Sequence, residues 1–193
     1  MEHKHGTTPE ERAGRPAPRI YVASLSDYND GRLHGRWIDA DQDAEALGES
    51  VNSMLASSEM PLAEEFAIHD YEGFGPVRLD EYESLESVSR VAHGISEHGA
   101  AFGHWISLNG STDESTCDGF EDAFLGCFES LEAYAEQLLD DLGYDTALES
   151  AVPEFLRSYV KIDVEGFARD LEMSGDVATS EGQDGVYVFD MRG

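Results

Sequence analysis

The most constraining feature of the chain is a segment of 66 residues, from Val91 to Leu156, that contains 14 Asp and Glu residues and no Lys or Arg. Soluble proteins ordinarily intersperse both signs, because like charges repel each other and destabilise a compact state. The bias extends to the whole chain, whose 41 acidic and 12 basic residues give a formal net charge of -29. Such a chain requires a basic partner, a function for the electric field itself, or an unusual solvent.

The composition nevertheless predicts a folded protein. Disordered acidic chains are poor in aromatic residues, whereas this chain has 9 Phe, 8 Tyr and 2 Trp, and 40% of its residues are apolar. Its 193 residues are enough to bury a core. The apolar runs are too short to span a bilayer, and the N-terminus lacks the apolar stretch of a signal peptide. We therefore expect a cytoplasmic protein with no membrane partner.

The first part of the chain is predicted to fold as β-β-α-β. Residues 1–19 mix His, Gly, Pro, Thr and Arg without periodicity and indicate a flexible tail. Alternating and helical patterns then predict strands at 20–24 and 33–39, a turn at 26–31 between them, a helix at 43–57 and a strand at 65–71.

The second part is predicted to be mostly helical and to end in a hairpin. Periodic apolar residues predict helices at 80–99, 101–108, 131–142 and 164–173, and Pro153 opens a further helix. The segment before Gly126 has no clear pattern. Strands at 176–180 and 186–190 close the chain, so the fold class is α+β.

The helix expected at 131–142 shows how the acidic residues are arranged. Apolar residues form one stripe at helical spacing: Leu131, Tyr134, Ala135, Leu138, Leu139 and Leu142. Glu132, Glu136 and Asp140 lie on the opposite side, one i to i+4 step apart. Each like-charge step costs about 0.2 to 0.5 kcal/mol, where a Lys would have gained about as much. For any one carboxylate, a place on the solvated surface is a sufficient explanation. The absence of Lys and Arg over 66 residues, however, favours a functional role for the carboxylates together.

No metal-binding or catalytic motif is present. Asp39 to Asp43 resembles the start of a calcium loop, but Ala44 replaces the required Gly and Ser50 replaces the bidentate Glu. His93, His98 and His104 lack the spacing of zinc ligands. His69 and Asp70 are not accompanied by a Ser or Cys in a nucleophile motif. The sequence thus predicts no metal, no cofactor and no enzymatic activity.

The charge has the magnitude of a DNA segment. Residues 20–193 carry 38 acidic and 8 basic residues, a net of -30. Duplex DNA carries one charge per roughly 1.7 Å, so this equals the charge on about 50 Å of duplex, and a dimer would equal about 30 base pairs. A folded polyanion of this size could compete with DNA for the Lys and Arg residues that contact phosphates.

An ordered set of motifs resembles the ArdA antirestriction proteins. In sequence letters the motifs are IYVASL at 20–25, YNDG at 28–31, GRW at 35–37, EEFAIHDYE at 64–72, FEDAFLG at 120–126, SLEAYAE at 130–136, YV at 159–160, FARDL at 167–171 and VYVF at 186–189. The resemblance implies a DNA mimic, carried on mobile elements, that inhibits type I restriction-modification enzymes. It would occupy the DNA channel of the methyltransferase core and specificity subunit, block restriction competitively and possibly modification, and not bind nucleic acid itself.

The resemblance also implies an elongated chain of three small domains and a homodimer. The domains would be a β-rich α+β domain at 20–78, a helical domain at 79–128 and a C-terminal α+β domain at 129–193 that contains the acidic antirestriction segment at 131–144. The expected mimic carboxylates are Asp70, Glu72, Asp80, Glu81, Glu83, Glu86, Glu121, Asp122, Glu129, Glu132, Glu136, Asp140, Asp141, Asp145 and Glu149.

The expected dimer contact lies beyond about residue 150, where apolar residues accompany four of the eight bases of residues 20–193. An interface depleted of repelling carboxylates costs least to form. The interface residues expected are Phe155, Tyr159, Phe167 and Tyr187.

Two other functions are compatible with the composition. A halophilic protein of different function would also be acidic and poor in Lys, but would be expected to keep a recognisable active site. An acidic chaperone or docking module for a basic DNA-binding protein would need no duplex-like shape.

Overall fold

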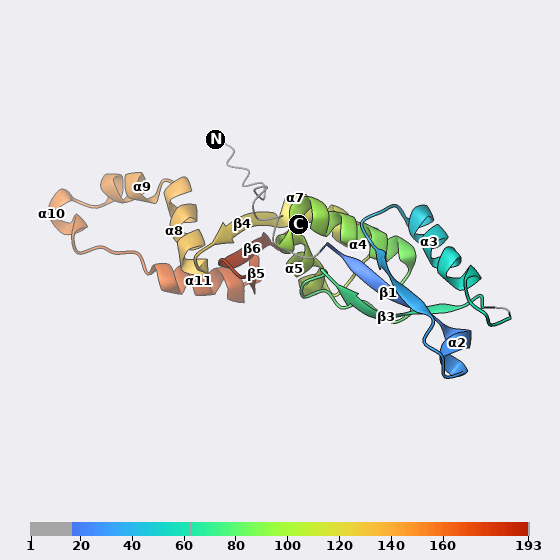
Figure 1. Ribbon diagram of the computed structural model, residues 1–193. Helices are drawn as coiled ribbons and strands as arrows, with labels where there is room; N and C mark the ends of the chain where they lie inside the picture. The colour runs from blue at the N-terminus through green and yellow to red at the C-terminus, as the bar shows by residue number, and fades with distance from the viewer. Residues whose placement is uncertain (1–16, 62, 193) are drawn as a thin grey trace. The chain divides into compact units, whose positions relative to one another are not determined.

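The computed structural model describes residues 17–61 and 63–192 (Figure 1). Residues 1–16 of the predicted tail at 1–19 lie outside the described residues. Arg19, the last residue of that prediction, is the first residue of a strand. The chain divides into two compact units, the first ending at Phe120 and the second beginning at Glu121. The division into three domains stays a prediction.

The first unit contains a three-stranded antiparallel sheet with the order β2-β1-β3. It is built from β1 (Arg19–Ser24), β2 (Gly35–Asp39) and β3 (Phe66–Glu72). Ile20 and Val22 of β1 and Ile38 of β2 are buried, whereas Arg19 and Trp37 on the alternate positions are exposed. This alternation gives the sheet one core face and one solvated face. The three predicted strands and the predicted helix before the third are found in this order, with one further short helix between the first two strands.

Helices pack beside this sheet. They are α3 (Ala44–Ala56), α4 (Leu85–His98), α5 (Ala100–Asn109) and α6 (Glu114–Asp118). Asp43 caps α3, because its carboxylate accepts a hydrogen bond from the amide of Ala46 at 2.8 Å. Leu47 and Val51 of α3 and Val88 and Val91 of α4 are buried. A last short helix, α7 (Phe120–Ala123), spans the boundary between the two units.

Two predictions for the first unit are wrong in detail. The expected turn at 26–31 begins as a short helix, α2 (Leu25–Asn29), because the Ser24 hydroxyl accepts a hydrogen bond from the amide of Asp27 and caps it. The helix expected from residue 80 begins only at Leu85. Ser84 caps it by accepting a hydrogen bond from the amide of Ser87 at 3.1 Å.

The second unit has a three-stranded antiparallel sheet with the order β4-β6-β5. Its strands are β4 (Phe124–Phe128), β5 (Val177–Glu181) and β6 (Val186–Asp190). The closing hairpin of β5 and β6 is confirmed. β4 was not predicted, although it pairs with β6 along Phe124 to Phe128.

Two helices complete the core of the second unit. They are α8 (Leu131–Asp141) and α11 (Val164–Met173). Tyr134, Val177 and Val188 form the buried cluster, and Leu131 and Leu138 pack against it. Gly143, with a φ of 72°, takes the left-handed conformation that follows the end of α8. The predicted helices at 131–142 and 164–173 are confirmed to within a residue.

The chain between these two helices has no buried side chain within its own helices, α9 (Tyr144–Ala151) and α10 (Glu154–Arg157). Leu142, which the sequence placed in the core stripe, is 71% exposed, because α8 ends at Asp141 and Leu142 is its C-cap. Among the helices of the described part of the chain, none combines the length and apolarity needed to cross a membrane.

Candidate functional site

The acidic side chains singled out from the sequence lie almost entirely at the surface. All fifteen expected mimic carboxylates are exposed except Glu72 and Glu83, which are half-buried. They come from both units. Those up to Glu86 belong to the first unit, and those from Glu121 onward to the second.

Three of the expected mimic carboxylates of the first unit interact with other side chains of that unit. Glu72, on β3, forms an ion pair with Arg19 on β1. Glu83 accepts a hydrogen bond from the Thr112 hydroxyl at 3.2 Å. Glu81 lies 3.9 Å from the imidazole of His69, which can neutralise it when protonated. These three side chains are therefore less available to an external base than the others.

The α8 helix separates its apolar and acidic faces. Tyr134 and Ala135 are buried, whereas Glu132, Glu136 and Asp140 are exposed on the other side. Ser130 begins the helix, because its hydroxyl accepts a hydrogen bond from the amide of Ala133 at 3.3 Å. A hydrogen bond with the Ser130 side chain lowers the pKa of Glu132. Glu132 is thus fully charged at neutral pH.

The acidic row continues beyond α8. Glu129 precedes the helix, Asp141 ends it, and Asp145 and Glu149 lie on α9; all four are exposed. Within the described residues of the second unit, 121–192, the one ion pair between an Arg or Lys and a carboxylate joins Arg192 to Asp190. No Lys or Arg of the residues that the structure describes therefore lies within 4 Å of the carboxylates of α8 and α9.

The base nearest in sequence to α9 is used differently. Arg157 donates from Nε to the carbonyl of Val152 at 2.9 Å and from Nη2 to the carbonyl of Glu149. It binds backbone oxygens rather than carboxylates, and so it secures the turn after α9. Arg157 therefore forms no ion pair with the neighbouring carboxylates of the described chain.

The four expected interface residues fall into two pairs. Phe155 and Tyr159 are 75% and 83% exposed, whereas Phe167 on α11 and Tyr187 on β6 are half-buried. The ring of Tyr187 lies 6.3 Å from that of Phe124, so it contributes to packing within the unit. The sequence pattern did not identify Leu142 and Met173 as exposed apolar side chains, although they are 71% and 79% exposed.

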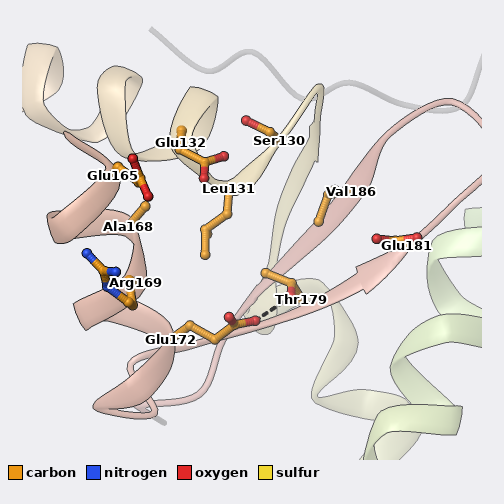
Figure 2. A pocket seen from close by; sticks show the side chains of 10 residues that line it. All are labelled: Ser130, Leu131, Glu132, Glu165, Ala168, Arg169, Glu172, Thr179, Glu181 and Val186. Carbon is orange, nitrogen blue, oxygen red and sulfur yellow. Dashed lines mark hydrogen bonds between the residues drawn. The ribbon is translucent and has the colours of Figure 1, made fainter.

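Sequence reasoning also missed a groove in the second unit (Figure 2). Its volume is about 410 Å³, and it lies where the start of α8, the exposed side of α11 and the β5–β6 hairpin meet. Its lining is Ser130, Leu131, Glu132, Glu165, Ala168, Arg169, Glu172, Thr179, Glu181 and Val186. No sequence motif marks this groove, because its residues come from three separate segments.

Among the residues that the structure describes, no three His, Cys, Asp or Glu side chains are grouped so that they could hold a metal ion. His93 instead lies 3.2 Å from Asp41 and 3.8 Å from Glu97, as a surface ion pair when protonated. His69 contacts Glu81 and the ring of Tyr28.

Fold and surface together define an acidic α+β protein whose exposed carboxylates, in the second unit above all, have few Lys or Arg partners among the residues that the structure describes. Residues 20–185 match the model of the family described as antirestriction protein (ArdA), and the chain belongs to this family. Its function is therefore antirestriction, directed against restriction-modification enzymes, and the family is one of inhibitors. The resemblance seen in the motifs is confirmed. A search of curated proteins finds no match for the chain.

Proposed function

We propose that this protein inhibits type I restriction-modification enzymes by occupying their DNA-binding channel in place of DNA. The observation that supports this most is the row of exposed carboxylates on α8 and α9, which forms no ion pair with a Lys or Arg of residues 17–61 and 63–192. A channel that binds DNA presents Lys and Arg to phosphates. Carboxylates without partners of their own can form ion pairs with these bases and release the counterions bound to both surfaces.

The target within the enzyme would be the methyltransferase core together with its specificity subunit. This assembly has to hold DNA both for recognition and for methyl transfer. An inhibitor that fills the channel would therefore block modification as well as restriction. The protein itself would not bind nucleic acid, because its net charge of -29 repels phosphates.

The proposal includes a homodimer, and the C-terminal segment supports it. Phe155 and Tyr159 are exposed on a segment whose two short helices bury no side chain of their own. Arg157 and Lys161 reduce the local negative charge there. A second copy could cover these aromatic rings, and the pair would carry twice the charge.

Competition between the protein and DNA tests this function. A type I methyltransferase core with its specificity subunit is incubated with labelled cognate duplex and increasing amounts of the protein. We expect displacement of the duplex, competitive kinetics, loss of methyl transfer, and an affinity that falls steeply as salt rises.

Two controls make the result interpretable. A variant with the α8 and α9 carboxylates replaced by Gln and Asn should fold but fail to displace the duplex. Inhibition of restriction that leaves DNA bound to the core would contradict the mimic mechanism. It would instead favour an acidic docking module that binds another surface of the enzyme or another basic protein.

A further inference from the structure

The groove of the second unit is concave and partly apolar (Figure 2). Leu131 at the start of α8, the buried Ala168 of α11 and the half-buried Val186 of β6 supply apolar surface. Glu136 and Asp140 of α8 and Asp145 and Glu149 of α9, by contrast, are exposed and do not line this groove. A hollow of about 410 Å³ can hold a long side chain together with adjoining groups, in the size range of small-ligand sites.

Charged groups surround this apolar floor. Four carboxylates line the groove: Glu132, Glu165, Glu172 and Glu181. Glu172 is fixed by a hydrogen bond that the Thr179 hydroxyl donates to it at 2.6 Å, from β5 to α11. The lining therefore has its negative groups on all three segments that form the groove.

Arg169 is the one base among the lining residues. It lies between Glu165 and Glu172 on α11, yet no carboxylate of the described residues is within 4 Å of its guanidinium. The four carboxylates outnumber it, so the groove has a formal charge of -3. The groove is thus anionic in spite of Arg169 and can accept a second cation.

We propose that this groove holds one long basic side chain, Arg or Lys, from the protein surface of the inhibited enzyme. An Arg or Lys side chain has an apolar stem and a charged head, which match the apolar floor and the acidic rim. The inference rests on the proposed function, because that function supplies a partner rich in exposed bases. The groove would add an oriented anchor to the otherwise diffuse charge attraction.

The first test separates the groove from charge in general. The double variant Glu165→Gln and Glu181→Gln removes two groove carboxylates, and the control Glu136→Gln and Asp140→Asn removes two exposed carboxylates of α8 outside it. The affinity for a type I methyltransferase core is measured for both. We expect the groove variant to bind about tenfold more weakly than the control, because it loses charge-assisted hydrogen bonds to a partly desolvated head group.

The second test fills the groove without changing its charge. Thr179→Tyr places a ring in the groove and removes the hydrogen bond to Glu172, and Thr179→Val removes the same bond without filling the space. We expect the Tyr variant to lose about tenfold in affinity relative to the Val variant. Circular dichroism and thermal unfolding show whether both variants are folded.

The outcomes distinguish this inference from the proposed function. If the wild-type protein displaces DNA, but the groove variants bind like their controls, the groove proposal is overturned and the mimic function stands. If the wild-type protein does not displace DNA from the core, both are overturned. If the wild-type protein displaces DNA and each groove variant binds more weakly than its control of equal charge, both proposals are supported.

Discussion

Arg192 holds Asp190 in a two-point ion pair at the end of β6, with Nε donating to one carboxylate oxygen at 3.0 Å and Nη2 donating to the other at 2.7 Å. Because these hydrogen bonds stabilise the charged carboxylate, they lower the pKa of Asp190 to about 2. A lowered pKa means that the pair stabilises the folded state above the ordinary carboxyl pKa of 3.8. This contribution is lost as the pH falls through about 2.

The first prediction follows from that pKa. Asp190→Asn should lower the free energy of unfolding at neutral pH, and its difference from wild type should shrink from about pH 4 downward and vanish below about pH 2. Urea unfolding over a pH series measures this difference. Asp184→Asn, in the loop between β5 and β6, is the matched control and should show no such trend. A difference that is unchanged through the acid range would contradict the role of the pair.

The second prediction concerns the start of α8. Ser130→Ala removes the hydroxyl that accepts from the amide of Ala133, and we expect it to cost about 1 kcal/mol of unfolding free energy. Ser53→Ala, at an exposed position inside α3, should instead be neutral or slightly stabilising, because Ala favours helix. Equal effects in chemical denaturation would show that the cap does not matter.

Much of the fold could be predicted where local signals agree. Asp43, Ser130 and Asp163 each precede an apolar stripe of helical period, and each caps the helix expected there. The strands of both sheets, apart from β4, were predicted from the alternation of apolar and polar residues. In such segments cap chemistry and periodicity point to the same structure.

Other elements depend on contacts that a local pattern does not show. The sequence of β4, Phe-Leu-Gly-Cys-Phe, does not alternate apolar and polar residues, although its side chains alternate between half-buried and exposed. The strand forms because β6 supplies its hydrogen-bond partners. α2 depends on the buried Asp27, whose carboxylate accepts a hydrogen bond from Ser58, 31 residues further along the chain, at 2.6 Å. These pairings are non-local, so turn chemistry alone gave the wrong structure at 26–31.

The candidate site could be predicted in composition but not in shape. The acidic face of α8 was found from its helical period, since Glu132, Glu136 and Asp140 are exposed as expected. The groove was not found, because Glu165 and Glu181 come to line one hollow only after α11 folds against the hairpin. The exposure of Leu142 was not predicted either, because helical periodicity does not show at which residue the last turn of α8 leaves the core.

The third prediction uses the two cysteines. Cys117 is buried, and burial raises the pKa of its thiol to about 11, whereas Cys127 is exposed on β4. Because the thiolate is the reactive form, iodoacetamide at mildly alkaline pH should modify Cys127 and spare Cys117 until the protein unfolds. Mass spectrometry of digested protein measures this. Fast modification of both thiols in the folded protein would contradict the burial of Cys117.

The fourth prediction concerns how function is distributed over the carboxylates. Neutralising any one of Glu132, Glu136 or Asp140 should change the affinity for the enzyme only slightly, because under the proposed mechanism each stands for one of many phosphates. Neutralising all of those on α8 and α9 should abolish inhibition and raise the melting temperature, since self-repulsion falls. Inhibition assays and thermal unfolding measure the two effects. Loss of inhibition from a single change, with fold and assembly intact, would point to a localised site.

The last prediction concerns assembly through the C-terminal segment. Phe155→Ser with Tyr159→Ser should convert a dimer into a monomer, because both side chains are exposed and would be covered only by a partner. Tyr82→Ser, which changes an aromatic side chain 70% exposed in the first unit, is the control and should leave assembly unchanged. For the unmodified protein, sedimentation over a salt series should show a dimer that tightens as salt screens the repulsion between two strongly anionic chains. A monomer at micromolar concentration under all salt conditions would contradict the pairing and would halve the charge that one particle presents to the enzyme.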